Sequence, residues 1–255
     1  MKHQLWISHG DKGGVGKSMV SHVLVELLRL GNKKVLLVDG EPENGDVAKR
    51  YAGIPEVKTV LIDLGTAELF EESINKLASE IEGALSEKIE CTVVNLPAGA
   101  SQCIDKDVRA LREIVDALNI EAFTLINVGD SDFSVKKSTE IAKSGLGQLG
   151  KTVYLLQQFF RSEIHQTIDS LKTANATELI DVPMFSFPKL DGMSISKLLE
   201  IHNKPMAYFM DTACGMSFIM RIRYSRFLTA ASEIMKQIDP DFVIPDLRLY
   251  KDKVD

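Results

Sequence analysis

A glycine-rich segment near the N-terminus, residues 10–18, constrains the fold more than any other part of the chain. It reads GDKGGVGKS and separates a short apolar run, residues 5–8, from apolar residues at helical spacing over 20–30. Glycines allow positive φ and leave backbone N–H groups free to point inward, and the start of the following helix adds a partial positive charge. A loop of this kind between a strand and a helix is typical of a phosphate-binding site.

Short apolar runs alternate with helical patterns along the rest of the chain. We expect strands over residues 35–38, 91–96, 123–127 and 153–156, and helices over 68–89, 105–118, 136–149 and 227–238. Strands that are nearly continuous in apolar residues are typical of a parallel sheet covered on both faces. The sequence therefore predicts a three-layer, doubly wound α/β fold with a mainly parallel sheet. No linker or repeat marks a boundary, so we expect residues 1–255 to form a single domain.

Composition narrows the class of protein further. The 255 residues carry a formal net charge of −6 and a sequence pI near 5.5, which argues against a protein that coats nucleic acid over its whole surface. No apolar run approaches the ~18 residues that span a bilayer, and the first residues lack the apolar stretch of a signal peptide. The three cysteines and five histidines show neither a disulfide framework nor the spacing of a metal site. We therefore expect a cytoplasmic protein.

The glycine-rich loop departs by one position from the common pattern G-x-x-x-x-G-K-[ST], because Asp11 stands where the first glycine is required. The loop has instead K-G-G-V-G-K-S, with a second lysine, Lys12, before the glycine pair. This resembles the deviant Walker A box of the ParA/MinD family of P-loop ATPases, nearest to the short ParA-like ATPases of plasmid partition, plasmid stability and conjugative transfer. In that family the extra lysine reaches across an ATP-sandwich dimer to the partner's nucleotide.

The resemblance implies ATP and Mg²⁺ as cofactors. Lys17 would place its ammonium on the β- and γ-phosphates, and the hydroxyl of Ser18 would ligate Mg²⁺. Lys12 and Lys17 are the lysines expected to take part in catalysis. The residues expected to bind the nucleotide from this loop are Asp11, Lys12, Gly13, Gly14, Val15, Gly16, Lys17, Ser18 and Met19.

The segment over residues 33–44 resembles the family pattern K-V-L-L-I-D-x-D-P-Q-x-N. By this resemblance the catalytic carboxylates are Asp39, near the metal and the phosphates, and Glu41, in the acidic position that polarises the attacking water. Glutamate can orient a water as aspartate does, but it is one methylene longer, so its placement has to adjust. The state of the γ-phosphate would order residues 39–44 and make ATP a switch for partner binding.

Asn95 is the main departure from the family. Residues 91–99, CTVVNLPAG, resemble the Walker B region V-I-I-D-x-P-x-G, with Asn95 in place of the aspartate that helps to hold the Mg²⁺ shell. Asparagine still accepts a hydrogen bond from a metal-bound water, but the negative charge is gone. Two interpretations follow. Either Asp39, Glu41 and Ser18 suffice for Mg²⁺ in a slow ATPase, which we favour, or the chain binds nucleotide as a switch and hardly hydrolyses it.

Later strands offer candidates for contacts with the adenine base. Relatives place a polar side chain after one of these strands, and Gln157 or Gln158 takes that position here, while Asn127 ends the preceding strand. Residues 180–183, IDVP, resemble the family's late I-P strand, whose backbone passes the base. We therefore expect Gln157 and Pro183 to contact the nucleotide.

Arg221, Arg223 and Arg226 lie at or just before the start of the last predicted helix. Cations at a helix N-terminus oppose the macrodipole, so helix stability does not explain them. ParA relatives bind DNA without sequence preference through basic residues on C-terminal helices, and these arginines are candidates for salt-dependent contacts with double-stranded DNA. The alternative is a solvated or salt-bridged face, for which the acidic segment 68–89 offers partners.

Together these observations predict a Mg·ATP-dependent ATPase that forms a homodimer and acts as a nucleotide switch in the segregation, stability or transfer of DNA. An adaptor or centromere-binding type of protein is the expected partner. Residues 245–255 have no apolar face and do not resemble the membrane-targeting helix of MinD-type proteins, so we expect no membrane partner. Three alternatives stay open: a MinD-type positioning ATPase, a nucleotide-binding adaptor, and an ATP-dependent ligase of the same clan, for which no carboxylate-substrate motif is evident.

Overall fold

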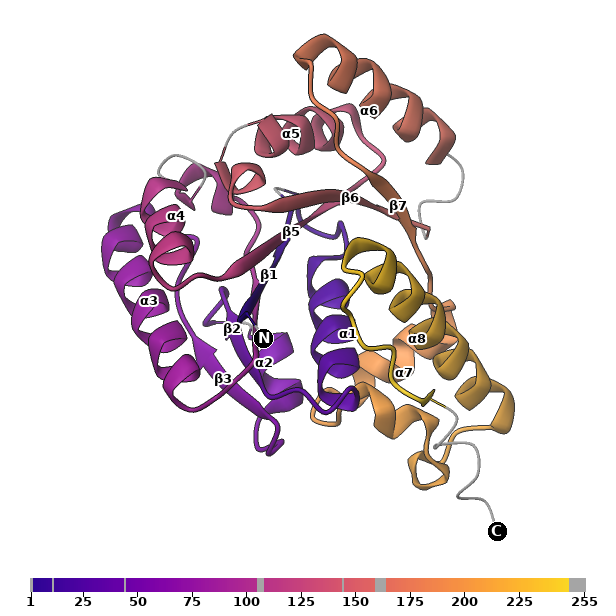
Figure 1. The fold of residues 1–255 in the computed structure, drawn as a ribbon. Helices are drawn as coiled ribbons and strands as arrows, with labels where there is room; N and C mark the ends of the chain where they lie inside the picture. Colours follow the sequence, from indigo (N-terminus) through magenta and orange to yellow (C-terminus); the bar gives the residue numbers. More distant parts are fainter. Residues whose placement is uncertain are drawn as a thin grey trace.

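The computed structural model of the chain describes residues 2–10, 12–43, 45–104, 108–143, 145–158 and 164–247. In these residues the strands are β1 (Gln4–His9), β2 (Val35–Asp39), β3 (Val57–Leu61), β4 (Cys91–Asn95), β5 (Glu121–Val128), β6 (Lys151–Gln157) and β7 (Met184–Phe187). They form one sheet in the order β3-β2-β4-β1-β5-β6-β7 (Figure 1), and every neighbouring pair is parallel.

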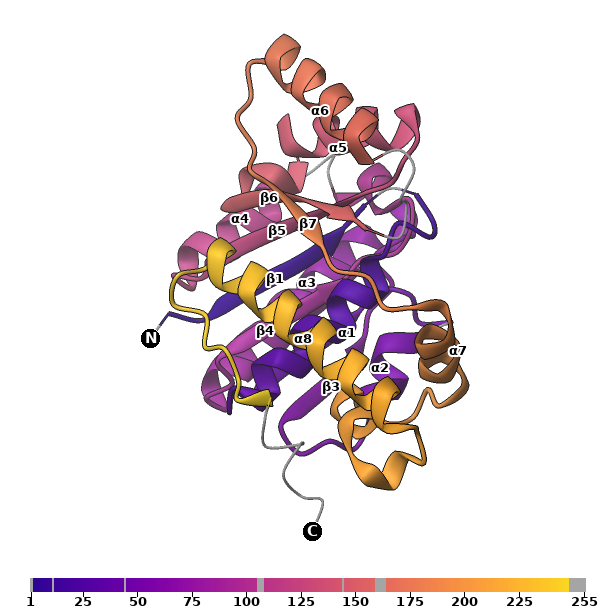
Figure 2. The same ribbon diagram turned by 90° about the vertical axis from the view of Figure 1, so that its right-hand side faces the viewer.

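Helices cover both faces of this sheet (Figures 1 and 2). The α-helices of the described residues are α1 (Lys17–Leu30), α2 (Asp46–Tyr51), α3 (Phe70–Ser86), α4 (Val108–Ala117), α5 (Asp132–Lys143), α6 (Ile164–Glu178), α7 (Gly192–Glu200) and α8 (Phe218–Ile238). Helices α1, α2, α7 and α8 pack on one face, and α3 to α6 pack on the other. The predicted three-layer, doubly wound α/β fold is confirmed.

The two apolar layers follow from the alternation of side chains along each buried strand. In β1, Trp6 points to the face of α1 and α8, whereas Leu5 and Ile7 point to the face of α3 and α4. Trp6 stacks on Phe123 of β5, with ring centroids 4.0 Å apart and an interplanar angle of 9°. Because β1 is central and packed on both faces, its C-terminal end is held firmly, and this end positions the glycine-rich loop.

One predicted helix is wrong at its C-terminal end. The pattern over 136–149 predicts a single helix, but α5 ends at Lys143 and a 3₁₀ turn, Gly145–Gln148, follows. Gly145 has a φ of 58° in this turn, a value that glycine adopts without strain. Gly147 passes so close to α5 that a Cβ would lie 2.3 Å from the carbonyl oxygen of Ile141, so the chain leaves the helix here.

The last helix is longer than predicted. Helix α8 begins at Phe218 rather than at residue 227, because the side chain of Ser217 accepts a hydrogen bond from the N–H of Met220 and caps the helix. None of the described helices, α8 included, is both long enough and apolar enough to cross a membrane. Residues 105–107 of the predicted helix 105–118 lie outside the described residues, as do residues 248–255 of the tail.

Leu179, directly after α6, adopts a backbone conformation that glycine usually supplies. Its φ is 54°, and its side chain is 92% exposed. The N–H of Ile180 donates to the carbonyl oxygen of Asn175 at 3.0 Å, which closes the end of the helix in the manner of a C-terminal cap. A leucine in the left-handed conformation is sterically unfavourable because of its Cβ, and this leucine buries no apolar surface that would compensate for the cost.

We therefore expect Leu179→Gly to stabilise the protein by roughly 0.5–1 kcal/mol, because glycine adopts positive φ without the steric cost of a Cβ. Chemical denaturation at equilibrium measures the change. Leu179→Ala is the matched control, since it removes the same exposed side chain but keeps the Cβ, and we expect it to leave the stability near that of the native protein. Equal stabilisation by both variants would show that the backbone is not strained.

Candidate functional site

The glycine-rich loop joins β1 to α1 and is held close to the end of β6. Gly14 and Gly16 have φ values of 78° and 100°, and Gly16 directly precedes the first turn of α1. A Cβ on Gly16 would lie 2.7 Å from the side-chain carbon Cδ of Gln157. A larger residue at this position would be strained by the positive φ and would push the Gln157 side chain aside, so glycine suits the position. Asp11 lies outside the described residues.

The two lysines of the loop have different environments. Lys17 is buried, and its Nζ donates to the backbone carbonyl oxygen of Lys12 at 3.1 Å, so its ammonium points back into the loop. The side chain of Lys12 is exposed, and its Nζ lies 3.4 Å from the hydroxyl of Ser131, in the connection after β5. Val15 is buried beneath the loop, 1% exposed. The loop therefore directs one lysine inward and one outward.

Buried polar side chains at the C-terminal ends of three strands hold this loop in place. The hydroxyl of Ser8 donates to the carbonyl oxygen of Lys17 at 3.0 Å. Asn127 Nδ2 donates to Ser8 Oγ and to the carbonyl oxygen of His9, each at 3.0 Å. Gln157 Nε2 donates to Asn127 Oδ1 at 2.8 Å. Asn127 and Gln157 thus connect β5 and β6 to the first turn of α1.

Asp39 and Asn95 form a second buried network, between β2, β4 and two helices. Asp39 is 0% exposed, and its Oδ2 accepts from the N–H groups of Val47 and Ala48 at 3.1 and 3.0 Å. Asn95 Nδ2 donates to Asp39 Oδ1 at 3.0 Å, and Asn95 Oδ1 accepts from the hydroxyl of Ser21 at 3.0 Å. Both Asp39 oxygens and both polar atoms of the Asn95 amide are therefore used inside the protein.

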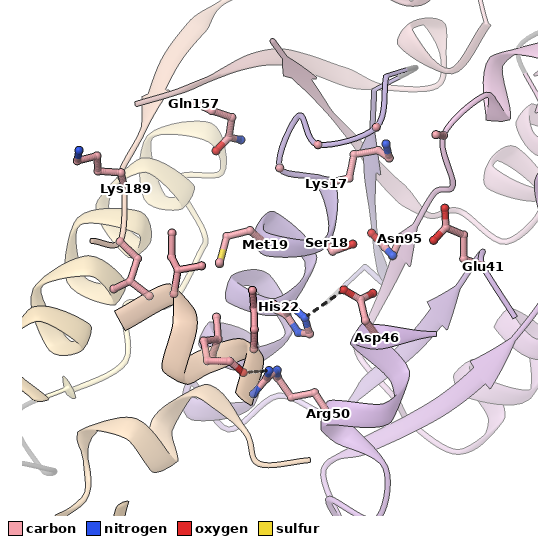
Figure 3. Close-up of a pocket in the computed structure, with 18 of the residues that line it drawn as sticks. Lys17, Ser18, Met19, His22, Glu41, Asp46, Arg50, Asn95, Gln157 and Lys189 are labelled. Atoms are coloured by element: carbon pink, nitrogen blue, oxygen red, sulfur yellow. Dashed lines mark hydrogen bonds and ion pairs between the residues drawn. The ribbon is translucent and has the colours of Figure 1, made fainter. Parts of the chain in front are cut away.

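A cavity of about 480 Å³ opens beside the loop. Its volume lies within the usual range for small-molecule sites. Figure 3 shows Ser18, Asn95, Glu41 and Asp46 on one side of it and Gln157 on the other. The remaining wall is largely apolar and comes from α1, α7, α8 and the segment after β7. Its residues include Met19, Pro188, Leu190, Ile195, Leu198, Leu199 and Phe227.

The structure brings most of the predicted nucleotide-binding residues to this cavity. The predicted residues that line it are Gly13, Gly14, Gly16, Lys17, Ser18, Met19, Glu41, Asn95 and Gln157. Pro183 lies at the opposite end of β7, where its carbonyl oxygen accepts from the N–H of Tyr154 at 2.8 Å. All strands run in one direction, so the cavity meets the C-terminal end of β7, and Pro188 lines it there.

Sequence reasoning missed Asp46, which lines the cavity at the start of α2. Its carboxylate lines the cavity together with the Ser18 side chain, and its Oδ2 lies 3.9 Å from His22 Nε2. Partial burial, followed by the negative charges of Asp39 and Glu41, raises the pKa of Asp46, despite hydrogen bonds that oppose the shift. In the sequence, Asp46 is recognisable only as an acid in the first turn of a helix.

His22 and Arg50 lie behind Asp46 in the same cavity. Burial, and to a smaller extent the charge of Arg50, lower the pKa of His22 far below its ordinary value, so the imidazole is neutral at pH 7. The Arg50 guanidinium donates to the backbone carbonyl oxygens of Leu198 and Lys204, each at 2.7 Å, and of Ile201 at 3.0 Å. Arg50 therefore fixes the C-terminal end of α7, which forms part of the cavity wall.

The donors at the cavity fit Mg²⁺ bound together with phosphates. No group of three or more His, Cys, Asp or Glu side chains in the described ranges could hold a metal ion by itself. Mg²⁺ usually takes one or two protein oxygen donors and fills its octahedron with waters and substrate phosphates. The Ser18 hydroxyl and the Asp46 and Glu41 carboxylates supply such oxygens beside the loop.

The three predicted DNA-contacting arginines lie on α8, away from the cavity. Arg223 pairs with Asp191 at 3.5 Å, and the guanidinium of Arg221 lies 5.7 Å from the ring centre of Phe218. The side chains of Arg223 and Arg226 are exposed and three residues apart, so they share one side of the helix. The acidic helix α3 covers the opposite face of the sheet, so the alternative of a salt-bridged face does not find its partners in residues 68–89, and Arg223 pairs with Asp191 instead.

Comparison with known proteins decides the family. The CobQ/CobB/MinD/ParA nucleotide binding domain (CbiA) matches residues 7–182, more than two thirds of the chain. The chain belongs to this family. Protein MobD of Acidithiobacillus ferrooxidans is 36% identical over 75 residues, which are 29% of this chain and 32% of MobD. The match thus spans about a third of the length of this curated relative.

Solved structures of the family share the fold. An ATP complex of McdA from Cyanothece aligns with a TM-score of 0.56 and 11% identity over 93% of this chain and 96% of that one. A putative plasmid partition protein of Borrelia burgdorferi bound to AMPPNP aligns at 0.52 and 16% identity over 92% and 99%. MinD of Pyrococcus horikoshii with Mg-ADP aligns at 0.51 and 18% identity over 93% and 99%. The predicted resemblance to ParA/MinD proteins is confirmed, and the chain has a nucleotide-binding domain of this family.

We expect Asn95→Asp to destabilise the nucleotide-free protein by about 2–3 kcal/mol, because it places a second buried carboxylate against Asp39. Repulsion raises the pKa of the pair in the folded state, so the folded protein then binds more protons than the unfolded chain. The deficit should therefore shrink as the pH falls from about 7 towards about 5. Denaturation of the native protein, Asn95→Asp and the control Asn95→Ala over this pH range measures the loss of stability. A loss that does not depend on pH in Asn95→Asp would contradict the prediction.

We expect Arg50→Lys to destabilise the protein by roughly 2–3 kcal/mol, since one ammonium cannot satisfy three carbonyl oxygens held by a planar guanidinium. Amide hydrogen exchange should become faster over residues 192–204, because α7 loses its attachment to α2. Lys49→Met, at the exposed neighbouring position, is the control and should leave exchange in this segment unchanged. Unchanged exchange in Arg50→Lys would show that packing alone holds α7.

Proposed function

We propose that the chain is a ParA-like, Mg·ATP-dependent ATPase that dimerises and acts as a nucleotide switch in the segregation, stability or transfer of plasmid DNA. The observation that carries this proposal is the glycine-rich loop with its buried Lys17, opening into a cavity of about 480 Å³ in a domain of a nucleotide-binding family. The plasmid partition protein and MobD, whose name relates to mobilisation, support the connection to DNA transfer or maintenance.

The site residues have distinct roles in this proposal. Backbone N–H groups of the loop and the N-terminus of α1 face the phosphates, and Lys17 exchanges the carbonyl oxygen of Lys12 for phosphate oxygens. Gln157, Met19 and Pro188 bound the part of the cavity that would hold the base and sugar. Mg²⁺, when bound, neutralises phosphate charge, and the hydroxyl of Ser18 is placed to hold it.

Glu41 orients the attacking water in this mechanism. Its carboxylate is partly exposed and lines the cavity on the same side as Ser18. The additional methylene of glutamate extends its reach from the turn after β2. A slow rate is expected, because Asn95 brings no negative charge to the cation site.

Lys12 acts on the nucleotide of the partner subunit. Its side chain is exposed on the outer side of the loop and directed towards Ser131, whereas Lys17 occupies the inside of the loop. A dimer with its two loops face to face would place Lys12 of each subunit beside the other subunit's cavity. The exposed side of α8 that carries Arg223 and Arg226 is proposed to contact double-stranded DNA, with Arg221 nearby, and an adaptor protein is proposed to read the ATP state.

A second function, a nucleotide-gated adaptor with little hydrolysis, is favoured by the bonding of Asn95. Its amide bridges Ser21 and Asp39 and occupies the position where a carboxylate is usual. Such a protein would bind ATP and dimerise without turnover. The two functions share every binding step and differ only in hydrolysis.

A complementation experiment tests the enzyme and the dimer together. Lys12→Ala and Glu41→Gln are each expected to reduce steady-state ATP turnover to background. In a mixed dimer, the subunit with Lys12→Ala keeps its own Glu41 and receives Lys12 from its partner. Random pairing in an equal mixture leaves about one in four sites complete, so about a quarter of the native turnover should return. Lys17→Ala mixed with Glu41→Gln is the control that should restore nothing, because each change disables the subunit's own site and neither site of the mixed dimer is complete.

The remaining outcomes separate the alternatives. Turnover that double-stranded DNA stimulates at low salt, and that falls in Arg223→Ala/Arg226→Ala, supports the DNA role. Native protein that binds ATP tightly and dimerises without any turnover is instead the nucleotide-gated adaptor. Turnover in Lys12→Ala alone, at the native rate, would exclude a role for this lysine in the partner's site.

A further inference from the structure

We propose that Asp46 supplies the carboxylate that holds the water shell of Mg²⁺ beside Ser18, in place of the aspartate that Asn95 replaces. This inference rests on the proposed function, because it concerns the cation that accompanies the nucleotide. The carboxylate near the cation would then come from the first turn of α2 instead of from the end of β4.

Asp39 and Asn95 are committed to bonds that hold the fold. Asp39 accepts two backbone N–H groups of α2 with one oxygen and the Asn95 amide with the other. The oxygen of the Asn95 amide accepts from Ser21. Turning either side chain towards a cation would leave buried donors without acceptors, which is energetically unfavourable. Asp39 is also fully buried and does not line the cavity.

Unlike Asp39 and Asn95, Asp46 is placed where its carboxylate can face a cation in the cavity. Its side chain is 54% exposed and lines the cavity together with Ser18, the residue expected to ligate the cation. Arg50, which lines the same cavity, donates to carbonyl oxygens at and after the C-terminal end of α7. The carboxylate therefore presents a negative charge to the cavity beside the hydroxyl of Ser18.

His22 gives an independent sign of a ligand at this position. The residue is only 6% exposed and lines the same cavity, and its Nδ1 has no hydrogen-bond partner in the described part of the chain. Figure 3 shows its ring beside Asp46, below Ser18. Buried polar atoms are nearly always paired with protein or water, so this ring nitrogen is available to accept a hydrogen bond from a group or water in the cavity. A water in the shell of a cation at Ser18 and Asp46 can donate to this nitrogen.

The test is a Mg²⁺ titration of the complex with a fluorescent ADP analogue. In Asp46→Asn we expect the Mg²⁺ concentration for half-saturation to rise about 10–100-fold, the usual effect of losing an outer partner of a metal. Affinity for the analogue in EDTA should stay at the native value, since Lys17 and the loop are unchanged. Glu56→Gln, an exposed carboxylate away from the cavity, is the matched control and should titrate as the native protein does.

A second measurement separates this role from a structural one. The Mg²⁺-dependent rise in the unfolding temperature of the ADP complex should disappear in Asp46→Asn, while the nucleotide-free protein unfolds at the native temperature or above it. Asp46→Glu keeps the charge and should recover most of the affinity for Mg²⁺. A purely structural aspartate would not be rescued in this way, and its loss would lower the stability with and without Mg²⁺.

The outcomes distinguish this inference from the proposed function. Native Mg²⁺ titration in Asp46→Asn, or equal affinity of the native protein for the analogue with Mg²⁺ and with EDTA, would overturn the role of Asp46 and leave nucleotide binding intact. Failure of the native protein to bind any adenine nucleotide would overturn the proposed function and this inference together.

Discussion

The carboxylate of Asp39 is the interaction on which the rest of the site depends. It accepts two N–H groups at the start of α2 and the amide of Asn95, and Asn95 in turn accepts from Ser21 of α1. Four elements, β2, β4, α1 and α2, are therefore joined through one buried anion. Its charge is stabilised by donors that lie within the fold, which is the condition for burying a carboxylate at all.

The far wall of the cavity depends on two more buried charges. Arg50 holds the carbonyl oxygens at the end of α7, and Glu26 of α1 accepts from the N–H groups of Met206 and Ala207 at 3.1 and 2.8 Å. Each ion satisfies backbone groups that a short helix or turn leaves open, so burial of the charge is compensated by directional bonds. The segment after β7 thus packs in one defined position and gives the cavity a fixed shape.

Sequence patterns predicted the central strands of the sheet and the glycine-rich loop. The elements and site residues that they did not predict were missed for physical reasons. The central strands are apolar on both faces, and glycine is required beside Gln157, so both are visible as local patterns. Strand β3 was missed because it is an edge strand whose residues are mostly half-buried. Pro188, which lines the cavity after β7, was not singled out, because the bounds of β7 are not marked in the sequence. Asp46 was missed because its partners, Ser18 and His22, come from another helix.

Helix α2 is only six residues long, and it touches both walls of the cavity. Asp46 at its first residue faces the loop, and Arg50 at its fifth holds α7, about 6 Å further along the axis at the usual rise per residue. About a turn and a half of helix thus spans the distance between the loop side of the cavity and the anchor of α7. The position of α7 is therefore fixed relative to the glycine-rich loop by one short, continuous piece of backbone.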